Sequence, residues 1–222
     1  MKGQRRITRS GQRRSDALSI ALWLRCILIL TTLTHFGAAP PERKRIQAAP
    51  LGDTPLKVDG RLDEAAWQRA PIASGFVERT PQPGQPASNR TEFRVLYDKD
   101  TVYVGLVMWT DGIAPRAWER ARDGFGVFSD DAISLKFDVR LDARTTVGFA
   151  TNASGVQLDY VSVENGNDFR REFDAIWDVE ATVEPDRWTA EFAIPVIALG
   201  LPSGRDVETI GLQISRDHNA RL

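Results

Sequence analysis

The chain has 222 residues, of which 42% are hydrophobic and 27% charged, with 29 basic and 30 acidic side chains and a formal net charge of −1. This length favours one domain with or without a tail, and the composition excludes a disordered or collagen-like chain. A single cysteine excludes a disulfide scaffold and any zinc site built from several cysteines.

Residues 1–39 have the layout of an export signal. Seven basic side chains and one acidic side chain give the segment a net charge of +6, and an apolar run follows that ends in small residues at Ala39. Basic, apolar and small segments in this order are typical of a secretory signal peptide. An uncleaved amino-terminal membrane segment is the alternative, although Arg25 within the apolar run makes a stable span costly. We therefore expect an exported protein that is periplasmic, outer-membrane-associated or secreted.

The remainder of the chain is acidic, with 22 basic and 29 acidic side chains and a net charge of −7. Nucleic acid is not expected as a partner, because phosphate contacts need a basic face. Residues 40–56 are rich in proline, alanine and charge and are predicted to be a linker. Residues 57–222 are predicted to form one domain.

Short strands dominate the predicted elements of this domain. A helical turn or two is expected within 62–70, and the strongest hairpin signal joins 92–97 to 101–109. A short helix is expected at 115–122, after a proline start. Six more strands are predicted at 132–139, 145–152, 156–163, 176–183, 188–194 and 209–215.

The strands alternate cleanly between apolar and polar residues. Ile133, Leu135 and Phe137 lie on one face of their predicted strand, and Trp188 and Phe192 lie on one face of theirs. Such alternation predicts sheets with one buried and one wet face. The fold class is therefore predicted to be all-β, an antiparallel, jelly-roll-like β-sandwich with one or two short helices. The tryptophans expected in its core are Trp67, Trp177 and Trp188.

Several segments resemble carbohydrate-binding module family 9 in the order in which that family has them. They are 58–67, 95–98 running into 102–105, Asp130-Asp131, Asn152 with Gly155, 188–195 and 210–212. The resemblance covers roughly residues 50–222. It implies a jelly-roll sandwich that binds sugar ends and often holds structural calcium. It also implies an amino-terminal module of a large exported protein, with an outer-membrane barrel-like or hydrolase-like region following beyond Leu222.

The resemblance also implies site residues. Phe128 stands where sugar-binding members have a stacking tryptophan, and Asn152 matches a polar position of the site. Ser134 and Ala150 stand where those members have a glutamate and an arginine, so much of the sugar clamp is missing. Two more candidates for sugar contact are Trp109, at a strand end, and Trp118, on the predicted short helix.

Calcium binds six to eight oxygen ligands, and pairs of turn carboxylates are its candidate ligands here. The predicted metal ligands are Asp98, Asp100, Asp130 and Asp131, with solvated turn carboxylates as the alternative reading. The acid excess of the domain makes a structural calcium more plausible.

Catalytic activity is not expected. A glycosidase needs two carboxylates in one cleft, with one pKa raised by burial. The strand carboxylates Asp159, Asp178, Glu180 and Glu191 are instead expected to face water. A catalytic triad depends on His218, close to the end of the chain, and no phosphate loop or dinucleotide fingerprint is present. A third hypothesis is a haem module with Met108 and His218 as axial ligands. Met108 alternates with core residues and is therefore expected to be buried, so haem is not expected, and neither is a nucleotide.

The sequence therefore predicts a non-catalytic carbohydrate-binding module of an exported protein, linked to polysaccharide catabolism or glycoside hydrolase-type proteins. The alternative is a structural periplasmic domain that accompanies an outer-membrane barrel and binds no sugar.

Overall fold

A computed structural model describes residues 44–166, 168–204 and 209–219. All but the first of these residues fall in one compact unit, Arg45–Leu222. The predicted export segment, 1–39, lies outside the described residues. Within the described ranges, no helix is long and apolar enough to cross a membrane.

The first sheet has five strands in the order β1-β2-β3-β9-β8. Its neighbours pair antiparallel, except that β1 runs parallel to β2. The strands are β1 (Ala49–Pro50), β2 (Thr91–Tyr97), β3 (Thr101–Trp109), β8 (Asp178–Val183) and β9 (Arg187–Pro195). The predicted linker therefore contributes β1 to the sheet, and Leu51 directly after it is buried.

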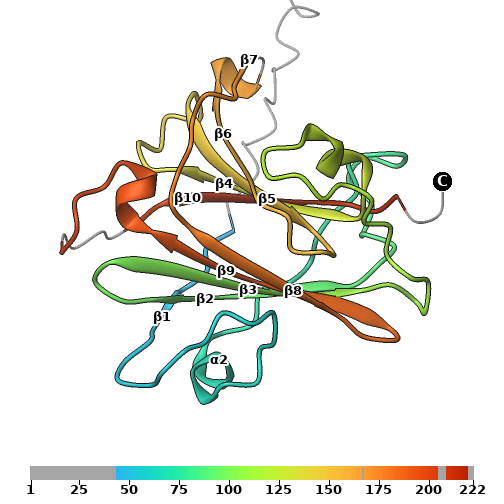
Figure 1. The fold of residues 1–222 in the computed structure, drawn as a ribbon, viewed down its shortest axis with the longest axis horizontal. Coiled ribbons are helices and arrows are strands. Elements are labelled where there is room, and N and C mark those ends of the chain that lie inside the picture. Colours follow the sequence, from blue (N-terminus) through green and yellow to red (C-terminus); the bar gives the residue numbers. More distant parts are fainter. Residues whose placement is uncertain (1–43, 167, 205–208, 220–222) are drawn as a thin grey trace, which may run out of the picture. The chain divides into compact units, whose positions relative to one another are not determined.

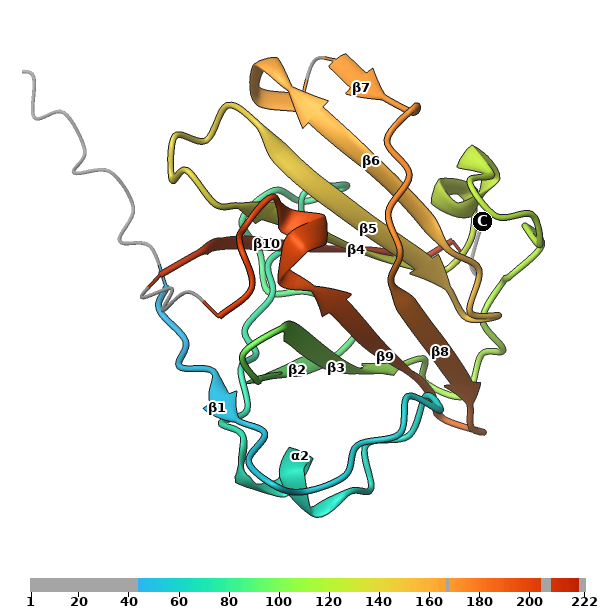
Figure 2. The same ribbon diagram turned by 60° about the vertical axis from the view of Figure 1, so that its left-hand side comes forward.

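The second sheet is fully antiparallel and has the order β10-β4-β5-β6-β7. Its strands are β4 (Ala132–Asp138), β5 (Thr146–Asn152), β6 (Leu158–Val163), β7 (Asp168–Arg170) and β10 (Gly211–Asp217). The two sheets lie one above the other in Figure 1, and the chain between β7 and β8 crosses from one sheet to the other in Figure 2. The antiparallel β-sandwich predicted from the alternation is confirmed.

The core between the sheets follows the predicted phases. Ile133 and Leu135 of β4 and Trp188 and Phe192 of β9 are fully buried within it. The ring of Trp177 stacks on that of Phe192, with 5.8 Å between centroids and 5° between planes. Apolar side chains two residues apart thus form the inner layers of both sheets.

Helices are few and short. They are α2 (Ala65–Arg69) and the 3-10 turns η1 (Phe125–Ser129), η2 (Glu164–Gly166) and η3 (Val196–Leu199). The helix predicted at 115–122 does not form. The backbone N–H groups of Arg116 and Glu119 donate instead to the carboxylates of Asp131 and Asp130, over 2.6 and 2.9 Å, and this holds the segment in a loop.

The outer face of the first sheet is covered by residues 58–70, which we name the strap. Figure 1 shows α2 of the strap beneath this sheet. The strap buries Trp67 completely, and the indole packs over Gly105 of β3, where a Cβ would lie 3.0 Å from the ring. Trp67 is buried as predicted, but in a separate cluster on this outer face with Ala66, Leu96 and Leu51.

Glu191 holds the strap in place. Its carboxylate is fully buried and accepts hydrogen bonds from the backbone N–H groups of Asp59 and Gly60 and from Nε1 of Trp67, over 2.9, 3.1 and 2.8 Å. Gly60 has a φ of +79°, and a Cβ there would lie 2.8 Å from the backbone of Ala181, so the turn requires glycine. The prediction that Glu191 faces water is wrong, because the strap covers the polar face of β9.

Asp159 is the second carboxylate that the strand pattern wrongly predicts to face water. It is buried, and its oxygens accept hydrogen bonds from Nε1 of Trp177 and the backbone N–H of Ala175 over 3.0 and 2.8 Å. The guanidinium of Arg122 lies 3.2 Å away. Burial raises the pKa of this carboxyl, and these three contacts oppose the rise. Asp159 therefore anchors the crossing segment that precedes β8.

Burial also raises the pKa of Glu191, to about 7 from an ordinary value of 4.5, and the nearby Glu64 adds to the rise while the three hydrogen bonds oppose it. The folded state therefore binds more protons than the unfolded state between these values. We expect the free energy of unfolding to fall by up to about 3 kcal/mol as the pH rises from 4.5 to 7, and to level off above. Urea unfolding across this pH range measures the slope.

The variant Glu191→Gln should remove that slope and cost about 1–3 kcal/mol, because its amide group places N–H donors against the donors of the strap. Glu180→Gln is the matched control, since Glu180 pairs with Glu191 across β8 and β9 but is exposed. An unchanged pH slope in Glu191→Gln, or a lost slope in Glu180→Gln, contradicts the assignment.

Candidate functional site

On the outer face of the second sheet, an aromatic side chain packs over a glycine of the neighbouring strand. Tyr160 of β6 pairs with Gly148 of β5, which pairs with Lys136 of β4. A Cβ on Gly148 would overlap the ring of Tyr160, so the ring lies flat across the strand. Tyr160 is fully buried, and its hydroxyl group forms a hydrogen bond with Ser134 Oγ at 2.9 Å. Burial raises the pKa of the Tyr160 hydroxyl.

Two phenylalanines flank Tyr160 and complete an aromatic row. Phe128 of η1 meets it edge-on with 6.1 Å between centroids, and Phe169 of β7 lies on its other side at 5.5 Å. Phe169 is 40% exposed, and Phe128 is half-buried. The row therefore presents ring surface to solvent at both ends while its centre is closed.

The ammonium group of Lys136 sits beside this row. Its Nζ lies 6.0 Å from the ring centroid of Tyr160 and 5.6 Å from that of Phe169. Burial and the nearby Arg79 lower the pKa of Lys136, while Asp217 opposes them. The positive charge is thus held in an environment that only partly compensates it.

A depression of about 420 Å³ opens on the same face. Most of its lining residues have polar side chains; the lining consists of Lys136, Ala143, Arg144, Thr146, Ser162, Gly166 and Gln213. Ser162 pairs with Phe169 across β6 and β7, so the depression adjoins the exposed end of the aromatic row.

Asn152, predicted to contact sugar, lies at one end of the sandwich. It is fully buried, and its Nδ2 donates to the carbonyl oxygen of Glu119 and to Asp130 over 3.0 and 2.9 Å. Its Oδ1 accepts from the backbone N–H and hydroxyl of Ser154 over 3.0 and 2.7 Å. Both amide protons are therefore used within the protein, to hold the loop before η1.

Asp131 belongs to the same end. Besides the bond from the Arg116 N–H, its carboxylate lies 2.8 Å from Nδ1 of His218, just beyond β10. His218 is therefore held at the strand end, whereas Met108 is fully buried in the core between the sheets.

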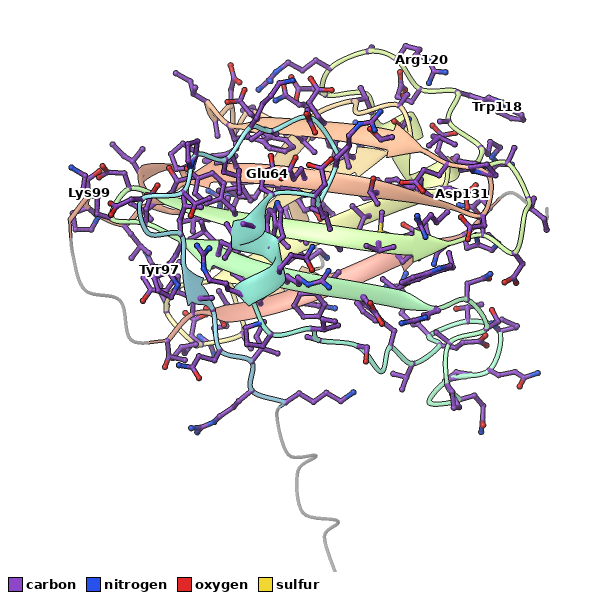
Figure 3. The ribbon with its side chains drawn as sticks, turned by 90° about the horizontal axis from the view of Figure 1, so that it is seen from below. Glu64, Tyr97, Lys99, Trp118, Arg120 and Asp131 are labelled. Atoms are coloured by element: carbon purple, nitrogen blue, oxygen red, sulfur yellow. The ribbon has the colours of Figure 1, made fainter. Side chains whose placement is uncertain are left out.

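The two candidate tryptophans make no ring contact with the aromatic row. Trp118 is 78% exposed in the loop before η1, with the guanidinium of Arg116 4.8 Å from its ring centroid. Figure 3 shows it pointing away from the domain, at the same end as Asp131. Trp109 ends β3 in the first sheet, beneath the guanidinium of Arg90 at 4.2 Å. Among the described ring contacts, neither tryptophan touches Phe128, although Asn152 bonds to the carbonyl oxygen of Glu119 beside Trp118.

Solved structures with the same architecture were found. A carbohydrate-binding module family 9 from Caldicellulosiruptor kristjanssonii in complex with cellotriose is 14% identical and has a TM-score of 0.54, with 79% of this chain and 77% of that chain covered. The same family's module from that organism in complex with glucose gives 12% identity and a TM-score of 0.53 over 78% of each chain. The fold is that of carbohydrate-binding module family 9. No family model matches the sequence, and no curated protein matches it.

The carboxylates predicted to hold calcium in this family 9 fold do not share a site. Asp98 caps the β2–β3 turn by accepting from the backbone N–H groups of Asp100 and Thr101, both over 2.8 Å. Lys99 of this turn and Asp131 lie at opposite ends of the sandwich in Figure 3.

Asp130 and Asp131 already accept N–H donors. In the described part of the chain, no cluster of three or more histidine, cysteine, aspartate or glutamate residues has metal-binding geometry. These four residues therefore do not form one shared metal site, and calcium stays a prediction from the sequence.

Sequence reasoning found Phe128 but missed Tyr160, Phe169 and Lys136. A strand pattern assigns Tyr160 and Lys136 to a polar phase, and only the pairing with Gly148 shows that they lie side by side. A glycine in the middle of a strand was the available signal, since it marks a close approach by another group.

Chelation tests the calcium prediction directly. Because N–H groups already occupy Asp98 Oδ1, Asp130 Oδ2 and Asp131 Oδ2, we expect excess EDTA to change Tm by less than about 1 °C. Differential scanning calorimetry with and without 2 mM added CaCl₂, roughly a saturating concentration for an extracellular site, measures this. A drop of several degrees that calcium restores would show a cation site.

Proposed function

We propose that this domain is a non-catalytic carbohydrate-binding module whose saccharide lies on the outer face of the second sheet. The observation that carries the proposal is the aromatic row with its exposed end at Phe169, beside a depression lined by hydroxyl and amide groups. Pyranose rings present apolar C–H faces to aromatic rings and hydroxyl groups to polar side chains.

The contrast between the two outer faces supports this location. The strap covers the first sheet and buries Trp67. On the second sheet, Phe169 and Gln213 are exposed, and Phe128 is half-buried. The solved family 9 structures bind glucose and cellotriose, which gives the class of ligand for this proposal.

Phe169 is the side chain to remove first, because it is exposed and its loss should leave the core intact. We expect Phe169→Ala to weaken saccharide binding about tenfold, equivalent to roughly 1.4 kcal/mol of lost ring contact. Isothermal titration calorimetry against a panel of oligosaccharides, or affinity electrophoresis in gels containing soluble polysaccharides, measures the change.

Trp118→Ala is the matched control, since it removes a more exposed aromatic ring from the loop at the end of the sandwich. Loss of binding in Trp118→Ala with retention in Phe169→Ala would move the site to that loop. A folded protein that binds no saccharide at millimolar concentration would favour the structural domain that accompanies an outer-membrane barrel.

The proposal includes export and a place in polysaccharide catabolism. The support is the +6 charge and apolar run of residues 1–39, ahead of a domain with a net charge of −7. A reporter that is active only outside the cytoplasm, fused after residue 56, should be active, and replacing Arg5, Arg6, Arg13 and Arg14 by glutamate should lower its activity several-fold. An inactive reporter with the intact segment contradicts export.

A further inference from the structure

The depression on the second sheet differs in charge from the rest of the domain. Two of its lining residues, Lys136 and Arg144, are cationic, and none is anionic. Residues 40–222 as a whole carry a net charge of −7. A positive depression in an acidic domain marks a place where a negatively charged ligand is favoured locally.

The charge of Lys136 is under-compensated. Among the described residues, no carboxylate lies within 4.0 Å of its Nζ, and the rings of Tyr160 and Phe169 lie beside it. Burial and Arg79 lower its pKa, so the protonated form gains free energy when an anion approaches. Asp217 is the carboxylate that acts on it electrostatically, and burial raises the pKa of that carboxyl.

Arg144 supplies a second contact from the turn between β4 and β5. Its backbone N–H donates to Asp142 over 2.8 Å, which fixes the turn, and its side chain lines the depression. A guanidinium group donates two parallel hydrogen bonds to a carboxylate. Gln213 and Thr146 add amide and hydroxyl groups for sugar hydroxyls on the same wall.

These groups match one kind of sugar unit. A uronate has a ring with an apolar face and a carboxylate attached to it, so it needs an aromatic surface next to a cation. Phe169 provides the surface, and Lys136 lies 5.6 Å from its centroid. The volume of about 420 Å³ is within the usual range for small-ligand sites.

We propose that the depression binds a uronate unit of an acidic saccharide, with Lys136 and Arg144 at its carboxylate and Phe169 against its ring. This proposal rests on the proposed function, because it names the class of saccharide that the same face takes.

The test compares three tetrasaccharides by calorimetry on the full domain: tetragalacturonate, its fully methyl-esterified form and cellotetraose. The ester keeps the ring and loses the charge. We expect the acid to bind at least tenfold tighter than the ester, and the difference to shrink as sodium chloride is raised.

Variants locate the effect. Lys136→Met and Arg144→Gln should each weaken binding of tetragalacturonate several-fold and bring the ratio of acid to ester affinity towards one. Lys99→Met is the matched control, because it removes an exposed cation from the β2–β3 turn of the first sheet, outside the lining of the depression, and should leave the ratio unchanged.

The outcomes separate the two proposals. Equal binding of acid, ester and cellotetraose overturns the uronate inference and leaves the proposed function in place, whereas no binding of any of them by folded protein overturns both. A preference for acid that persists in both cation variants overturns the location. Displacement of tetragalacturonate by equimolar sodium sulfate would show a general anion site and overturn the saccharide assignment.

Discussion

The buried carboxylate of Glu191 is the contact on which the arrangement of this domain depends. It joins β9 to the turn at Asp59 and Gly60 and to the indole of Trp67, across more than 120 residues of chain. Three N–H donors that would otherwise be buried without partners are satisfied by one side chain, which is why the strap stays on the first sheet. The strap closes the outer face of the first sheet, so the proposed ligand site lies on the second sheet.

Both sheets have an aromatic side chain packed over a glycine on their outer face. Trp67 packs over Gly105 on one outer face, and Tyr160 lies across Gly148 on the other. The strap and Leu96 enclose Trp67, so its ring serves stability. Tyr160 is buried in a smaller cluster with Val127, Ala150 and Leu158, and Phe169, which lies against its ring, remains exposed. The same aromatic–glycine packing therefore forms a core on one side and the floor of a candidate site on the other.

Alternation in the sequence predicts the sandwich, every described strand except β1 and β7, and the burial of Trp177 and Trp188, because it reports which side chains share a face. It does not report what covers that face. Glu191 was therefore assigned to water although the strap buries it, and the loop at 115–122 was read as helix although Asp130 and Asp131 hold its N–H groups. The missed parts of the candidate site depend on the same long-range pairings, such as that of Gly148 with Tyr160.

Charge sets how an acidic saccharide would reach this face. The domain carries −7 overall, so a polyanion approaching from a distance is repelled, and this repulsion is screened beyond about 8 Å at physiological salt. Attraction begins only where Lys136 and Arg144 lie closer to the ligand than the surrounding carboxylates do. Recognition therefore acts on a single sugar unit in contact with the depression and not on the charge density of a whole chain. Long-range repulsion combined with short-range attraction lowers the rate of association and selects for ligands whose ring and carboxylate both fit, which is the behaviour required of a module that must discriminate among polysaccharides of similar charge.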